Sequence, residues 1–177
     1  MLMFFKKRSY DIVKMFINQL AISIFGMALA LATGTNQETL RNVTSIFSIA
    51  FYLFLIYVMV WDLGAKDSHK IEKGEAGQTR ATGLFLALAA SLINVLLAVF
   101  IMLGSLVPAL GNLGAIAKVI ALLTEGMYAG LLAITVDGVA LNTVWYMYFL
   151  LPIPLIITSS LAYIFGSKNL KFFSKKK

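Results

Sequence analysis

The residues of this sequence that could bind or transport a ligand are few, and two of them lie inside an apolar stretch. Segment 104–138 is rich in Leu, Ala, Ile and Gly, yet it carries Lys118 and Glu125. On a helix these two residues, seven apart, project within about 20° of each other. A charge at membrane depth is costly and usually faces a bundle interior or a watery cavity. Together with Asp137 and Asn94, they form our candidate ion or ligand site.

The most polar part of the chain is segment 62–80. An acid–base or metal-binding role for Asp67 and His69 would use the near-neutral titration of imidazole. A single histidine without any cysteine is a poor set of transition-metal ligands. We therefore interpret the segment as a solvated loop whose cations contact anionic lipids and set the orientation. Its first residues form a candidate partner-docking motif, with Gly64 expected to stop the preceding helix: Asp62, Gly64, Lys66 and Asp67.

Recognisable catalytic patterns are absent from the sequence. There is no GxxxxGK[ST], HExxH or GxSxG motif, and there is no cysteine. A lipid-modifying enzyme would need a carboxylate or a histidine at the membrane interface, and Asp137, Asp62 and His69 form no recognisable dyad. We therefore expect a protein that is not an enzyme and that has no cofactor and no metal centre.

The composition identifies the solvent in which this chain folds. Of its 177 residues, 60% are hydrophobic and 13% are charged, and the mean hydropathy is +0.87. Soluble domains carry about 25% charged residues. An integral membrane protein is therefore predicted, and the net charge of +7 is assigned to lipid contact and orientation rather than to nucleic-acid binding.

Four stretches are long and apolar enough to cross a bilayer, which takes about 20 residues. They lack the alternation of a membrane β-barrel, so we predict an all-α protein of four transmembrane helices in a single membrane domain over 1–177. The expected spans are residues 16–33, 43–61, 81–103 and 144–165.

The number of spans depends on segment 104–138, which is also long enough to cross. Four spans with both termini inside put thirteen Lys and Arg residues on the inner side and two, Arg41 and Lys118, on the outer side. A fifth span would change this to eight inside and six outside. The positive-inside rule favours four spans. Segment 104–138 is then an outer re-entrant or interfacial helical segment, and five spans remain the alternative.

Two short motifs carry a family resemblance. Trp61-Asp62-Leu63-Gly64-Ala65-Lys66-Asp67 follows the second span, and Leu161-Ala162-Tyr163-Ile164-Phe165-Gly166 precedes a lysine-rich tail. In these motifs the chain resembles small uncharacterised polytopic membrane proteins of Gram-positive bacteria. The resemblance implies a bacterial plasma membrane location and no particular activity.

Two functions are compatible with these features. The first is an accessory or regulatory subunit that packs against another membrane protein, or against a second copy of itself, through small-residue helix surfaces. The alternative is a small stand-alone transporter or channel with a polar route near Lys118 and Glu125. Both would have cytoplasmic termini and anionic lipids at the inner face.

Overall fold

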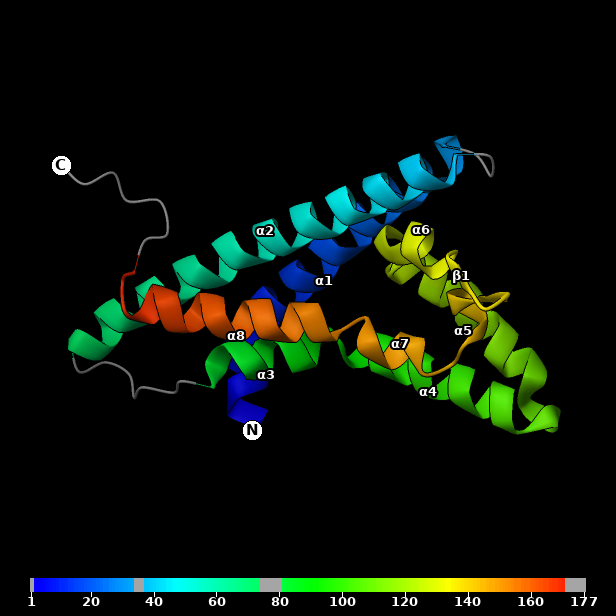
Figure 1. Cartoon of the computed structure of the whole chain (residues 1–177). Helices are drawn as coiled ribbons and strands as arrows, with labels where there is room; N and C mark the ends of the chain where they lie inside the picture. The colour runs from blue at the N-terminus through cyan, green and yellow to red at the C-terminus, as the bar shows by residue number, and fades with distance from the viewer. Residues whose placement is uncertain (1, 34–36, 74–80, 171–177) are drawn as a thin grey trace.

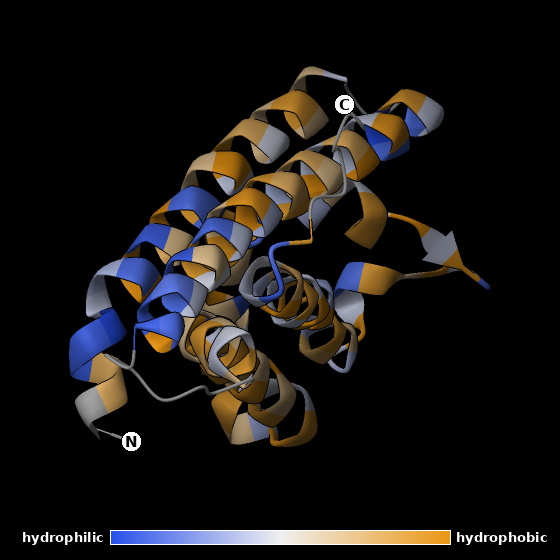
Figure 2. Ribbon diagram, turned by 90° about the vertical axis from the view of Figure 1, so that its left-hand side faces the viewer, coloured by the Kyte–Doolittle hydropathy of each residue, from blue (hydrophilic) through white to orange (hydrophobic). Residues whose placement is uncertain are grey.

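The computed structural model describes residues 2–33, 37–73 and 81–170, and nearly all of these are helical. Two long helices, α1 (Leu2–Ala32) and α2 (Glu38–Glu72), run antiparallel along the molecule (Figure 1). Large apolar side chains such as Phe47, Phe51 and Phe54 of α2 are exposed. Figure 2 shows that hydrophilic residues gather mostly on the parts of α1 and α2 near the N-terminus. Such helices are suited to a lipid environment.

Proline and serine residues interrupt the later helices. Helix α3 (Thr82–Ala90) and helix α4 (Leu92–Leu106) meet at Ser91 with a bend of 50°. The Ser91 hydroxyl donates a 2.6 Å hydrogen bond to the Ala87 carbonyl, a contact that often bends helices. Helix α4 ends at Leu106 because Val107, which precedes a proline, is extended.

Helix α7 (Met147–Leu150) precedes α8 (Ile153–Ser167), and the interruption falls at Leu151 and Pro152. The sequence expectation of a helix at 144–165 therefore corresponds to two pieces, and the longer piece begins beside the prolines Pro152 and Pro154.

A bent excursion lies between α4 and α7. After the short 3₁₀ helix η1 (Pro108–Leu110), helix α5 (Gly111–Thr124) packs back against α4. The chain then bends by 88° into the 3₁₀ helix η2 (Gly126–Tyr128) and the single-turn helix α6 (Ala129–Leu132).

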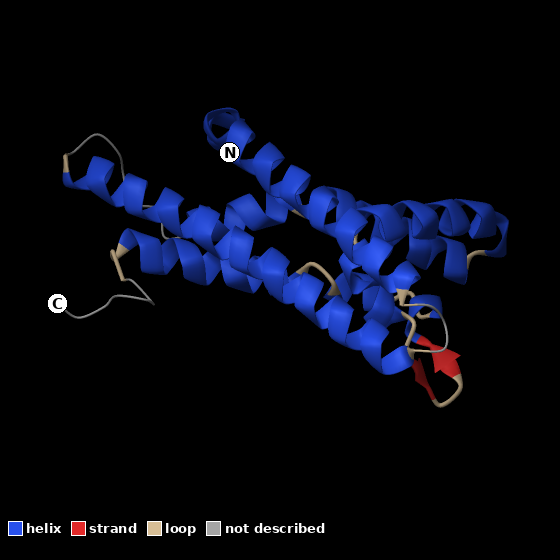
Figure 3. Cartoon of the chain, turned by 90° about the horizontal axis from the view of Figure 1, so that it is seen from above, coloured by secondary structure: helices blue, strands red, loops and turns tan. Residues whose placement is uncertain are grey.

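A small hairpin follows the excursion and lies at the end of the molecule away from both termini (Figure 3). Strand β1 (Thr135–Val136) pairs antiparallel with β2 (Val139–Ala140), and the 3₁₀ helix η3 (Leu141–Thr143) leads on to α7. Asp137 and Gly138 form the turn with φ values of 51° and 80°. This is the conformation of a tight hairpin turn, which favours Asp-Gly.

Close helix packing holds the bundle together. At Gly83 an added Cβ would clash with the Ser159 carbonyl oxygen of α8. At Gly104 it would lie 2.7 Å from the Gly114 nitrogen, so α4 and α5 meet at two glycines. Small residues permit this close backbone approach between helices.

Length and composition identify three helices that could span a membrane among the described residues. These are Phe4–Ala32, Glu38–Glu72 and Met147–Ser167, and the number rises to five if each bent helix pair is one span. The mostly helical fold agrees with the all-α prediction. The first helix starts earlier than expected, and α2 continues through residues 62–72 of the expected loop. Residues 74–80 of that loop and the lysine-rich tail at 171–177 lie outside the described residues.

Candidate functional site

The structure brings together two of the four residues predicted to form an ion or ligand site. Glu125 and Asn94 line one small cavity inside the bundle. Lys118 lines a different cavity of about 320 Å³ beside Asn142, Thr143 and Tyr148. Asp137 is exposed in the hairpin turn. The predicted set is therefore divided between three places.

Glu125 and Lys118 separate because the helix on which their spacing was counted ends between them. Helix α5 stops at Thr124, and Glu125 takes φ −127° and ψ 20°. Its amide still donates a 2.7 Å hydrogen bond to the Ala121 carbonyl. The chain then turns by 88°, so a helical wheel that includes Glu125 does not apply here. The Glu125 side chain consequently lies in the interior and is only 3% exposed.

Helix α1 supports this break in the chain. The Gln19 amide nitrogen donates a 2.9 Å hydrogen bond to the Thr124 carbonyl, and the Ser23 hydroxyl donates one of 2.7 Å to the same oxygen. Gly126 lies so close to α1 that an added Cβ would be 2.7 Å from the Ser23 carbonyl oxygen. The last carbonyl of α5 is thereby satisfied, and the Glu125 side chain is held beside α1.

The oxygens that remain around the cavity form the most unusual feature of the molecule. Glu125 Oε1, Gln19 Oε1, Asn94 Oδ1 and the Tyr52 hydroxyl are all buried and lack a hydrogen-bond partner. Their residues are between 1% and 3% exposed. In the part of the chain that the structure describes, no Lys, Arg or His forms a salt bridge with Glu125. Buried polar atoms are normally paired, so such a group indicates a functional site or a bound water or ion.

The four residues lie at similar depths in the bundle. Gln19, Tyr52 and Asn94 are 13, 14 and 12 residues from the ends of α1, α2 and α4 that lie toward the hairpin. Glu125 is 14 residues from the start of α5 at that same end. At 1.5 Å per residue, each lies about 20 Å along its helix. This places the cluster well inside a hydrocarbon core of about 30 Å.

The sequence analysis missed Gln19 and Tyr52 as site residues. Gln19 was expected near the inner end of a span that began at residue 16, but α1 begins at Leu2, so Gln19 lies in mid-helix. Tyr52 is a polar aromatic residue in the middle of α2, where a membrane-interface role does not fit. The available signal was a polar side chain at the midpoint of each of these helices.

The predicted docking residues Gly64 and Asp67 are used within the chain. Asp67 is 7% exposed, forms a salt bridge with Arg8 and accepts a 3.0 Å hydrogen bond from the Tyr163 hydroxyl. Contrary to expectation, Gly64 does not end its helix. It allows close approach to α8, where an added Cβ would lie 2.9 Å from the Ser167 nitrogen.

The other two predicted docking residues, Asp62 and Lys66, are exposed at that end of α2. They form a salt bridge with each other at 2.6 Å. Exposed pairs of this kind contribute little to stability.

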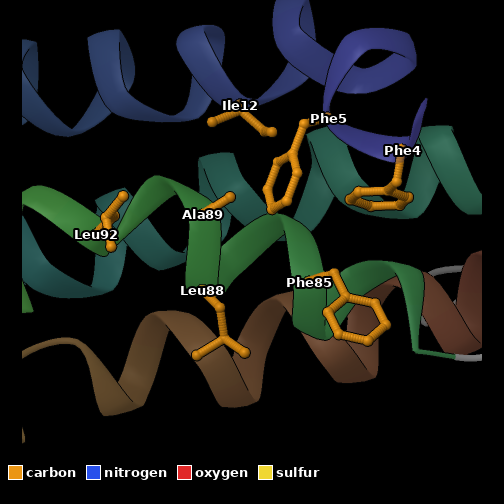
Figure 4. Close-up of a pocket in the computed structure, with 7 residues that line it drawn as sticks. All are labelled: Phe4, Phe5, Ile12, Phe85, Leu88, Ala89 and Leu92. Carbon is orange, nitrogen blue, oxygen red and sulfur yellow. The ribbon is translucent and has the colours of Figure 1, made fainter. Parts of the chain in front are cut away.

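The largest cavity offers no polar chemistry. It has a volume of about 670 Å³ and lies between α1 and α3, and Figure 4 shows its lining side chains. All seven are apolar, namely Phe4, Phe5, Ile12, Phe85, Leu88, Ala89 and Leu92. None can donate to or accept from a ligand through its side chain. We therefore place the candidate site at the smaller polar cavity.

The donor set of the polar cavity does not suit a transition metal. Among the described residues, no group of three or more His, Cys, Asp or Glu side chains could hold a metal ion. The cavity offers carboxyl, amide and hydroxyl oxygens, which suit protons and hard cations. No protein family model matches the chain, and no curated protein or solved structure matches it significantly.

Proposed function

We propose that this chain is a small membrane transporter, not an enzyme, and that its transported species binds at the cavity formed by Gln19, Tyr52, Asn94 and Glu125. The observation that carries the proposal is the buried Glu125 carboxyl oxygen without a partner, at the point where α5 ends. Ionisable side chains inside membrane segments mark ion and substrate pathways. Interrupted helices with a polar residue at the break recur at transporter binding sites.

The proposal includes a topology of four spans with α5 and α6 as a re-entrant segment. Helix α5 starts at the end of α4, and α6 returns to the first turns of α2, where the Gly130 amide donates a 3.0 Å hydrogen bond to Ser45 Oγ. Figure 1 shows these ends and the hairpin on one side of the molecule. The cation count of the sequence supports cytoplasmic termini, in a plasma membrane, with anionic lipids at the inner face.

A transporter is favoured over a channel because the site is closed. Each polar side chain around the cavity is nearly inaccessible, including Tyr128 at 6% exposed. Lys118 lies seven residues before Glu125, about 10 Å nearer the hairpin end, in the larger cavity. We interpret that cavity as an approach to the closed site.

The accessory-subunit role has less support. It depended on small residues left free for a partner helix, whereas Gly26, Gly64, Gly83 and Gly126 all make close contacts within the chain. The residues Asp62 and Lys66 remain available to a partner at the end of α2.

The transport proposal is tested with the purified protein in liposomes. Vesicles loaded with a fluorescent reporter of Na⁺, K⁺ or H⁺ are given an inward gradient of that ion. We expect faster uptake of at least one ion than in protein-free vesicles. Glu125→Gln should slow this uptake by about tenfold or more, because it removes the only acidic side chain that lines the cavity.

Glu72→Gln is the matched control, since Glu72 is an exposed acid at the end of α2. Its uptake should equal that of the unaltered protein. Equal rates for Glu125→Gln and Glu72→Gln, or no uptake of any of the three ions above the protein-free rate, would contradict the proposal.

A further inference from the structure

We infer that the cavity at Glu125 binds a single dehydrated monovalent alkali cation of about the size of Na⁺. The inference rests on the proposed transport function and names the species that occupies its site. It is carried by three features of the cavity: the chemistry of its oxygens, its size and its charge.

The unpaired atoms are oriented as acceptors. Gln19 donates its amide nitrogen to the Thr124 carbonyl, and this hydrogen bond leaves its Oε1 as the group without a partner. Asn94 Oδ1 and Glu125 Oε1 also have no donor. A ligand that offers positive charge satisfies all three of these oxygens, whereas a second acceptor would add to their number. Amide and carboxylate oxygens are the groups that hard cations prefer.

The size of the cavity limits the occupant to one small particle. Its volume is about 10 Å³. This is close to the smallest space that holds one water molecule. An organic substrate or a hydrated ion does not fit, while a bare alkali cation does.

The charge of the cavity favours a monovalent ion over a divalent one. Glu125 is the only charged side chain among the residues that line it. One monovalent cation neutralises the ionised carboxylate, whereas a divalent cation would leave a net positive charge inside the membrane. Such a charge is costly at this depth.

Binding also has a structural consequence. The three oxygens come from α1, α4 and the break after α5. An ion held by all three would tie the re-entrant segment to α1 and α4. It would therefore stabilise the closed state by binding to it alone.

The test measures binding of radioactive sodium to the purified protein in alkaline detergent buffer, where proton competition at the carboxyl group is small. We expect saturable binding of one ion per chain that excess unlabelled NaCl displaces and that choline chloride does not. Glu125→Gln should weaken this binding by about tenfold or more, and Glu72→Gln should not. Thermal unfolding of the unaltered protein gives a second readout that needs no variant: NaCl should raise the midpoint above that in choline chloride of equal ionic strength.

The outcomes separate this inference from the transport proposal. Proton uptake that depends on Glu125, without sodium binding or sodium-dependent stabilisation, would overturn the cation inference and leave the transporter standing. Saturable sodium binding without ion uptake would support the cation site and overturn the transport function. A site that holds only a buried water would show neither sodium binding nor stabilisation, and the inference would be wrong.

Discussion

Two buried acids, Asp67 and Glu125, have opposite surroundings. Asp67 has a salt bridge with Arg8 and a hydrogen bond from Tyr163, so its charge is compensated. Glu125 is more deeply buried, yet its Oε1 has no partner. We therefore assign a structural role to Asp67, which joins α1, α2 and α8, and a ligand-binding role to Glu125.

The structural role predicts a large effect of Asp67→Asn on stability. This change removes the negative charge that Arg8 faces and leaves the guanidinium partly buried and unpaired, at a cost of about 3 kcal/mol. The thermal unfolding midpoint in detergent should fall clearly. Asp62→Asn is the control, since its exposed pair with Lys66 contributes less than about 1 kcal/mol. Equal midpoints for the two variants would show that the buried pair is not stabilising.

At the scale of the elements, the break between α5 and η2 positions the site. Two glycines allow it to lie against α1: an added Cβ at Gly26 would be 2.6 Å from Met127 Cα, and one at Gly126 would be 2.7 Å from the Ser23 carbonyl oxygen. Both neighbouring atoms belong to the backbone, so they cannot move without shifting a helix. The glycines therefore determine how closely Glu125 approaches Gln19.

Gly126→Ala should consequently disturb both stability and transport. The added methyl group pushes the break away from α1 and lengthens the hydrogen bonds from Gln19 and Ser23 to Thr124. We expect a lower unfolding midpoint and a loss of ion uptake in liposomes. Gly111→Ala is the control in the same segment, because nothing lies within 4 Å of its added Cβ. It should keep full uptake and unfold at the same or a higher temperature, as Ala favours helix by about 1 kcal/mol. If Gly126→Ala behaved like Gly111→Ala, the close contact would have no role in positioning the site.

At the scale of the whole molecule, the open question is how the bent segment crosses or re-enters the membrane. A re-entrant α5 and α6 put the β1–β2 hairpin on the side opposite the N-terminus. A fifth span puts the hairpin on the same side as the N-terminus. The chain has no cysteine, so single-cysteine labelling distinguishes the two topologies cleanly.

We expect Thr135→Cys to react with an impermeant thiol reagent in intact cells, because Thr135 is exposed in the hairpin. Ser9→Cys, exposed near the start of α1, should react only after the cells are permeabilised. This pattern supports four spans and the orientation given by the cation count. Protection of both positions until permeabilisation would instead indicate five spans.

The apolar helical character of the protein follows from composition alone, since a chain with 60% hydrophobic and 13% charged residues exposes too much apolar surface for water. The apolar lengths likewise located the main helices to within several residues. Glu125 and Asn94 were predicted as site residues because a polar group inside an apolar helix is costly without a function.

Tertiary contacts decided the rest. The end of α5 at Thr124 depends on Gln19 and Ser23 of α1, more than a hundred residues earlier in the chain, so no local pattern of the segment could reveal it. The same break separated Glu125 from Lys118 and brought it to Gln19 and Asn94. Gly64 stayed in its helix because its missing side chain serves packing against α8. Local sequence determines which segments are helical and apolar. Which polar atoms remain unpaired depends on partners from other helices, and these are defined only when the bundle has packed.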